Sequence, residues 1–281
     1  MPGTGPPERV AYASGMAVVS RISIAPVKGL ALAHPDEVQI DTTGVLANRR
    51  FYVVDDRGRR YGQIRNGRLV QIRAAYDPER EHLALTFPDG TIAQGIVDLA
   101  EETTTDFYGR PVNGRVVAGP WATALSAWCG RSLRLVQPAA GQAVDRARGH
   151  VSLVSDASLR ELARQANENE PVDGRRFRML FQVDGLQAHE EDTWLRRNVR
   201  IGEALVRFRG VVGRCAITTQ NPDTGLPDFD TLRVLNAYRG LDAKRELPFG
   251  VYGEVLEPGR VRVGDLAEPL ELSLLDATAS S

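Results

Sequence analysis

One segment of the chain combines residue types that can bind a metal or act as a nucleophile. Cys215 is followed by Thr218 and Thr219 and then by the sequence Asn-Pro-Asp-Thr-Gly at 221–225. This tight turn predicts that the cysteine lies at the end of a strand, among backbone N–H donors. Such donors favour the thiolate, which is the nucleophilic and metal-binding form. The alternative interpretation is a buried strand cysteine that packs as a small apolar side chain.

The other cysteine, Cys129, has no comparable polar neighbours. It follows Trp128 in a predicted helix, and we interpret it as a packing residue. Two cysteines cannot form a disulfide framework, a four-cysteine zinc site or a plant-type iron–sulfur centre, so a reducing cytoplasm fits them best. The four histidines lack the spacing of a metal site, and the chain lacks a phosphate loop, a dinucleotide fingerprint and a Gly-x-Ser-x-Gly elbow.

The composition excludes further classes of protein. The chain has 281 residues, of which 35 are basic and 36 acidic, and its net charge is −1. This balance argues against a general nucleic-acid or membrane-surface binder. No apolar run approaches the roughly 18–20 residues of a membrane span. Lys28 and Lys244 are the only lysines, so 33 of the basic residues are arginines.

Short strands and turns are predicted for most of the chain. Turns recur every 8–12 residues, which is typical of a sandwich or barrel and not of alternating strands and helices. We expect hairpins around Gly58, Gly90, Gly109 and the Pro-Gly pair at 258–259. The second strand of the first hairpin is expected at 60–64.

Helices are fewer and define where the chain divides. Proline or serine starts and apolar spacing of three and four residues predict helices at about 120–128, 155–163 and 229–238. Residues 1–15 have no periodic apolar pattern and are interpreted as a disordered leader. The pattern as a whole predicts a mainly β protein, divided near residues 120–140.

The segment around Cys215 also resembles a known family. Residues 213–225, with Leu-Pro-Phe-Gly-Val-Tyr-Gly at 247–253 and Val-Arg-Val-Gly-Asp at 261–265, resemble the MOSC family, which is related to the C-terminal domain of molybdenum cofactor sulfurase. Residues 22–30 and 48–55 resemble the β-barrel domain that precedes it. Within the family, the chain most resembles the mitochondrial amidoxime-reducing component and its bacterial relatives.

This resemblance implies a fold and a domain organisation. The fold class is mainly β (α+β), in which an N-terminal β-barrel-like domain precedes a MOSC β-barrel domain with a few peripheral helices. The leader at 1–15 would be followed by the MOSC-type N-terminal domain at 16–137. The MOSC domain would occupy 138–281.

The resemblance further implies a cofactor. In the family, the cysteine that matches Cys215 is a thiolate ligand of molybdenum, which is held on a pyranopterin dithiolene. A soft thiolate suits this metal, and cationic side chains suit the phosphate of the pterin. For each arginine the alternative is a surface salt bridge, and the threonines could equally be strand residues. The matching cofactor-binding positions are Lys28, Gly29, Arg50, Arg178, Thr218, Thr219 and Tyr252.

Two departures from the family pattern concern this site. The relatives have a Thr-Ala-Arg-like stretch and a proline where this chain reads Gly-Gln-Ile-Arg-Asn-Gly-Arg at 62–68. After Arg178 they have Pro-Asn, where this chain has Met179 and Leu180. The missing asparagine removes one expected contact to cofactor or substrate.

Three functions follow as hypotheses. The first is a molybdenum-cofactor oxidoreductase that removes oxygen from small N-hydroxylated or N-oxide substrates. A separate ferredoxin or flavoprotein would supply its electrons, because the chain stops soon after its last predicted strand and lacks cysteines for a cluster. The second is a sulfur transferase that carries a persulfide on Cys215. The third is a non-catalytic module that binds or carries the cofactor.

Overall fold

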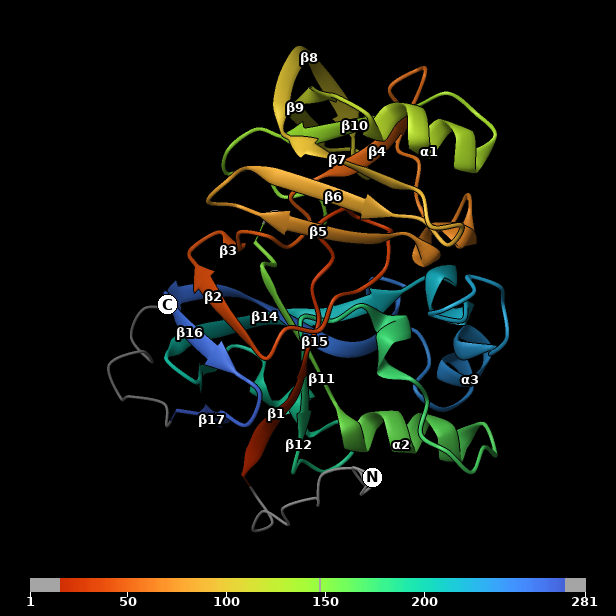
Figure 1. The fold of residues 1–281 in the computed structure, drawn as a ribbon. Coiled ribbons are helices and arrows are strands. Elements are labelled where there is room, and N and C mark those ends of the chain that lie inside the picture. Colours follow the sequence, from red (N-terminus) through yellow and green to blue (C-terminus); the bar gives the residue numbers. More distant parts are fainter. Residues whose placement is uncertain (1–15, 147, 271–281) are drawn as a thin grey trace, which may run out of the picture.

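Strands form most of the computed structural model, which describes residues 16–146 and 148–270. The leader predicted at 1–15 lies outside the described residues. Two groups of strands are stacked in Figure 1, with most of the first half of the chain above and the second half below. This arrangement confirms the predicted mainly β fold.

Seven strands close a barrel around one apolar core. Its fully buried side chains include Val19, Phe181, Phe208 and Val251. Only β11 and β12 pair in parallel, and the other neighbours are antiparallel. The first described strand therefore belongs to the barrel of the second half. The order around the barrel is β1 (Ala17–Ile22), β12 (Phe181–Asp184), β11 (Val151–Ser155), β15 (Leu247–Glu257), β14 (Ala204–Arg214), β13 (Asn198–Ile201) and β17 (Leu266–Pro269).

Two smaller sheets enclose a second core in the first half. This core includes Phe51, Leu83 and Trp121, all fully buried. The hairpins predicted at Gly90 and Gly109 are present, and both glycines have the positive φ that these turns require. One sheet has the order β4 (Tyr52–Asp55), β10 (Leu133–Pro138), β9 (Pro111–Ala118) and β8 (Asp98–Asp106); the other is β5 (Arg73–Asp77), β6 (His82–Thr86) and β7 (Ile92–Ile96).

Two predicted hairpins differ from the structure. The strand expected at 60–64 reduces to one bridge between Arg60 and Val54, because the chain then turns into the 3₁₀ helix η1 (Gly67–Gln71). The hairpin through Gly259 is wrong. Strand β16 (Gly259–Arg262) leaves β15 and pairs with β2 (Glu37–Asp41), which also pairs with β3 (Gly44–Val45).

The physical reason for this pairing is burial. Val38, Ile40 and Val261 all join the apolar core of the barrel, so pairing β16 with β2 buries the apolar sides of both strands. The sequence pattern correctly predicted strands at these residues. It did not predict that β16 pairs with β2, which lies more than 200 positions away along the chain.

The three predicted helices are present. They are α1 (Trp121–Cys129), α2 (Asp156–Gln165) and α3 (Thr231–Tyr238). Ser155 caps α2 by accepting a hydrogen bond from the backbone N–H of Ser158. None of the helices in residues 16–146 and 148–270 has the length and hydrophobicity needed to cross a bilayer.

Candidate functional site

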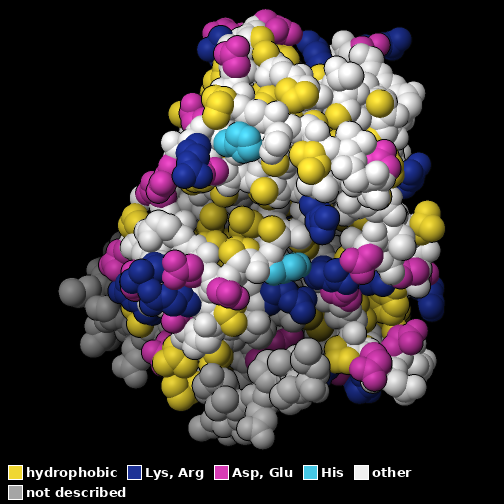
Figure 2. Space-filling model, viewed as in Figure 1, with side chains coloured by type: hydrophobic (Ala, Val, Ile, Leu, Met, Phe, Trp, Pro, Cys, Tyr) yellow, Lys and Arg dark blue, Asp and Glu magenta, His cyan; other side chains and the backbone are white. Residues whose placement is uncertain are grey.

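A cavity of about 670 Å³ is lined by residues from both halves of the molecule. Ten of its lining residues are Lys or Arg and two are Asp. On the face drawn in Figure 2, by contrast, basic and acidic side chains are interspersed. A chain with a net charge of −1 thus concentrates positive charge at one place, which is typical of an anion-binding site.

Cys215 lies at the wall of this cavity, directly after the last residue of β14. Its backbone carbonyl accepts hydrogen bonds from the backbone N–H and the hydroxyl of Thr218, each at 3.0 Å. These bonds fix the 3₁₀ turn η4 (Ala216–Thr219) that follows. Because Cys215 is exposed and the turn is held by other atoms, its thiol is accessible to a ligand in the cavity.

Arg214 is the cation next to this thiol. Its guanidinium is buried and donates hydrogen bonds to the carbonyl of Phe249 at 2.8 Å and that of Phe177 at 3.1 Å. It also contacts the sulfur of Met179 at 3.0 Å, so one residue of the departure from the family pattern helps to position it. Burial lowers the pKa of Arg214 to about 9.

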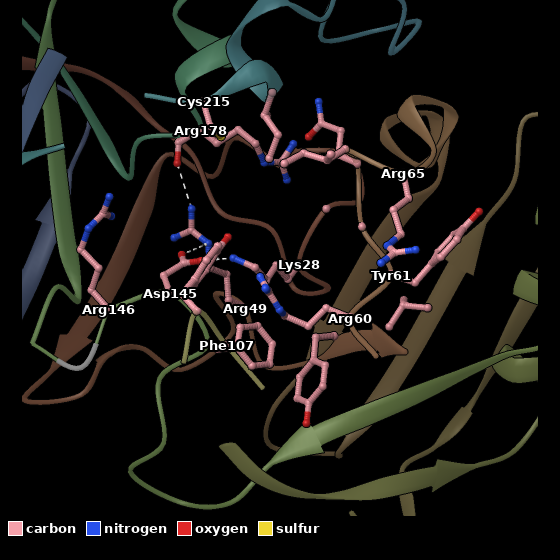
Figure 3. Close-up of a pocket in the computed structure, with 18 of the residues that line it drawn as sticks. Lys28, Arg49, Arg60, Tyr61, Arg65, Phe107, Asp145, Arg146, Arg178 and Cys215 are labelled. Atoms are coloured by element: carbon pink, nitrogen blue, oxygen red, sulfur yellow. Dashed lines mark hydrogen bonds and ion pairs between the residues drawn. The ribbon is translucent and has the colours of Figure 1, made fainter. Parts of the chain in front are cut away.

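Four residues form an inner charged group, which comprises Lys28, Arg49, Asp145 and Arg178 (Figure 3). The Asp145 carboxylate forms ion pairs with Lys28 and with Arg49, the latter at 2.6 Å. Arg49 donates to the backbone carbonyl of Arg178 at 3.0 Å, and Arg178 donates to that of Leu30 at 2.6 Å. Lys28 and Arg49 therefore share one carboxylate, and Arg178 adds a third positive charge that has no carboxylate partner among residues 16–146 and 148–270.

This inner charged group is electrostatically unfavourable by itself. Burial lowers the pKa of Arg49 to about 9 and that of Arg178 to about 10. Burial, and then the charges of Arg49 and Arg178, hold the pKa of Lys28 well below its usual value. Arg49 and Arg178 also have positive φ angles of 55° and 52°, which are uncommon for arginine. A bound anion would offset this concentration of positive charge.

The structure brings together some of the predicted residues and separates others. Lys28, Gly29, Arg178, Cys215 and Thr218 all line the cavity. These residues come from three separate segments of the chain, so it is the fold that brings them together.

Arg50, Thr219 and Tyr252 do not line it. Arg50 lines a different cavity, together with Gln137. The hydroxyl of Thr219 donates to the carbonyl of Ala216 at 2.8 Å. The ring of Tyr252 contacts the cavity residue Arg146, whose guanidinium stacks on it at 4.9 Å.

Sequence reasoning missed several cavity residues. Asp145 and Arg146 lie in a loop without a periodic pattern. The sequence predicted Arg50 as the cofactor-binding residue, whereas its neighbour Arg49 lines the cavity. Arg60 and Arg65 follow a turn that was interpreted as an ordinary hairpin. The arginines that cluster between residues 49 and 65 could have indicated this part of the cavity. The cluster is hard to recognise because the chain has 33 arginines in all.

A metal here would have few protein ligands. No group of three or more His, Cys, Asp or Glu residues within 16–146 and 148–270 could hold a metal ion. A metal that arrives with its own sulfur ligands needs only one thiolate, and a phosphate on the same group needs cations. Cys215 and the inner charged group provide this combination, so the residues present fit a molybdenum pterin.

Comparison with known proteins identifies both halves. A family model described as the MOSC N-terminal beta barrel domain matches residues 16–134, and one described as the MOSC domain matches 140–268. Mitochondrial amidoxime reducing component 2 of Homo sapiens is 37% identical over 120 residues, which cover 40% of this chain and 35% of that protein. For component 1 of Mus musculus the identity is 33% over 120 residues, covering 40% and 34%.

The chain thus spans about a third of the length of these curated relatives. Among solved structures, the YUAD protein from Bacillus subtilis is 13% identical with a TM-score of 0.44, and the match covers 92% of this chain and 98% of that one. The two family matches together extend from residue 16 to residue 268. The chain belongs to the MOSC family, with an N-terminal MOSC β-barrel domain before its MOSC domain.

Proposed function

We propose that this protein is a molybdenum-cofactor oxidoreductase that removes oxygen from N-hydroxylated or N-oxide compounds. The observation that supports the proposal best is the exposed thiol of Cys215 at the wall of a cavity with ten basic residues. Two curated relatives are named amidoxime-reducing components, which agrees with this class of substrate.

Each part of the cavity has a role in the proposal. Cys215 is the thiolate ligand at the wall of the cavity. Lys28, Arg49 and Arg178 bind the phosphate of the pterin. When bound, the cofactor supplies two-electron redox chemistry at a metal that accepts oxygen. Gly29 and Thr218 shape the wall beside these groups.

The overall reaction defines what else is needed. Reduction of an N-hydroxy group to an N–H group consumes two electrons and two protons and releases water. The cavity is open, so solvent can deliver the protons. Cys129 and Cys215 are the only cysteines and cannot ligate a cluster, so we propose a separate ferredoxin or flavoprotein as the electron donor. The cytoplasmic location stays a prediction.

The test uses protein made in a host that synthesises the pterin cofactor. We expect near-stoichiometric molybdenum and reduction of benzamidoxime to benzamidine with chemically reduced methyl viologen as donor. Protein free of metal that accepts sulfane sulfur on Cys215 would instead establish sulfur transfer. Protein that retains the cofactor but reduces no N-hydroxylated compound with any reductant would be a carrier.

A further inference from the structure

The cavity has an outer part that the cofactor role leaves without a function. We call this part the outer arginine site; it consists of Arg60 and Arg65 with the side chains of Tyr61, Phe107 and Tyr108. In Figure 3, Arg60 lies beside Lys28 at the edge of the inner charged group, and Arg65 lies farther along the cavity. Both follow the turn after β4, whereas the inner charged group draws on other segments of the chain.

The two arginines lack the carboxylate partners that many other arginines have. Within residues 16–146 and 148–270, neither Arg60 nor Arg65 forms an ion pair. Arg59, from the same turn, pairs with Asp55 at 2.8 Å. A second carboxylate, Asp106, lines the cavity but is not paired with either guanidinium. Their charges are therefore available to a ligand.

The outer arginine site also has an apolar wall. The guanidinium of Arg60 stacks on the ring of Tyr108 at 4.1 Å and on that of Phe107 at 5.1 Å. Tyr108 is 69% exposed, so part of this aromatic surface is open to solvent. Stacking holds the Arg60 guanidinium in place and reduces the entropy lost when it binds an anion. The combination suits a ring or chain that ends in a carboxylate or phosphate.

We propose that the outer arginine site binds an anionic group on the substrate, so that the enzyme prefers N-hydroxylated compounds that carry a carboxylate or phosphate. This proposal rests on the proposed function for the identity of the reacting group. The inner charged group serves the cofactor, and Arg60 and Arg65 recognise the far end of the substrate.

The test compares two substrates with the same reacting group. The ratio of kcat/KM for 4-carboxybenzamidoxime to that for benzamidoxime is measured on one preparation of holoenzyme with reduced methyl viologen. Incomplete cofactor loading cancels in this ratio. We expect a ratio of about 10 for the natural sequence, because charge-assisted hydrogen bonds to a carboxylate are strong. The preference should appear mainly in KM and should decline as salt is added.

The variants locate the preference. The double variant Arg60→Gln/Arg65→Gln should lower the ratio about tenfold, and Arg65→Lys should retain more of it than Arg65→Gln. Arg80→Gln is the matched control, because Arg80 is 82% exposed and pairs with Asp77 on the surface. This control should change the ratio less than about twofold. A ratio near one in the natural sequence, or an unchanged ratio in the double variant, would overturn the proposal.

Two further measurements separate the proposal from the function on which it rests. Binding of 4-carbamoylbenzoate and of benzamide to the holoenzyme is compared by calorimetry, which needs no turnover; a preference for the anion that the double variant loses supports the outer arginine site even if no amidoxime is reduced. The molybdenum and pterin contents of the double variant are also measured. Loss of the cofactor would show that these arginines bind its phosphate and would overturn the proposal.

Discussion

The surroundings of the two cysteines differ in almost every respect. Cys129 is the last residue of α1, is half-buried, and packs against the core of the first half. Cys215 follows a barrel strand, is exposed, and faces a cavity rich in arginine. Burial raises the pKa of the Cys129 thiol, which keeps it protonated. The same side chain thus serves packing at one place and suits metal binding at the other.

The comparison shows what a reactive thiol requires from the fold. A helix places its residues against a core on one side, so a cysteine there gains apolar contacts and loses access. The end of a strand in a closed barrel places a side chain at the rim, where loops from other elements bring charges. At Cys215 these charges come from β14 itself and from loops of both halves.

The largest difference is expected in turnover. Cys215→Ser should lower amidoxime reduction at least ~100-fold, because a hydroxyl is a much harder ligand than a thiolate. Cys129→Ser is the matched control and should keep most of the activity. The rates are measured with reduced methyl viologen at equal protein concentrations. Equal losses in both variants would remove the functional distinction between the cysteines.

The next difference concerns the two lysines. Lys28→Met should weaken cofactor retention about 10- to 100-fold, since it removes a charge-assisted contact from the inner charged group. Lys244→Met is the control, because Lys244 is exposed and does not line the cavity. The measurement is the pterin that remains bound after gel filtration. Similar retention in both variants would show that Lys28 does not bind the cofactor.

Thiol reactivity should distinguish the cysteines without any cofactor. In protein made without the cofactor, iodoacetamide at pH 7 should alkylate Cys215 roughly tenfold faster than Cys129, because Cys215 is accessible. Burial raises the pKa of Cys129, so its thiolate forms only at a pH above the ordinary range of a thiol. Its alkylation should therefore accelerate only at that higher pH. Peptide mass spectrometry gives both rates. Faster modification of Cys129 at pH 7 would contradict the described environments.

The smallest effect is expected in stability. Here the Cys129 substitution should have the larger effect, whereas the Cys215 substitution should have the larger effect on turnover. Cys129→Ser should lower the free energy of unfolding by about 1 kcal/mol, because serine loses part of the apolar contact that Cys129 makes with the core. Cys215→Ser should change it by less than about 0.5 kcal/mol, as is usual for an exposed residue. Urea unfolding of both variants measures this. A larger loss at Cys215 would indicate a structural role for that side chain.

Local features of the site and the fold could be predicted from the sequence. The string around Cys215 was specific enough to identify the family, and the three helices and two of the four hairpins were found from local residue types. Turn glycines and helix caps act over a few residues, which is why they can be recognised without a structure.

Features that depend on distant parts of the chain could not be predicted. Arg49 and Arg50 are adjacent, and only the fold determines that Arg49 faces the cavity. Asp145 acquires its role by meeting Lys28 from another segment. The partner of β16 is set by burial against the barrel, where β2 offers a matching apolar side. Each case requires a contact between segments that local patterns do not encode.

The central claim is that Cys215 holds molybdenum, and metal content tests it directly. Elemental analysis is applied to the natural sequence and to Cys129→Ser and Cys215→Ser, all made in one host that synthesises the cofactor. We predict about one molybdenum per chain in the first two proteins and a large loss in Cys215→Ser. Full molybdenum with full activity in Cys215→Ser, or no molybdenum in the natural sequence, would contradict the claim.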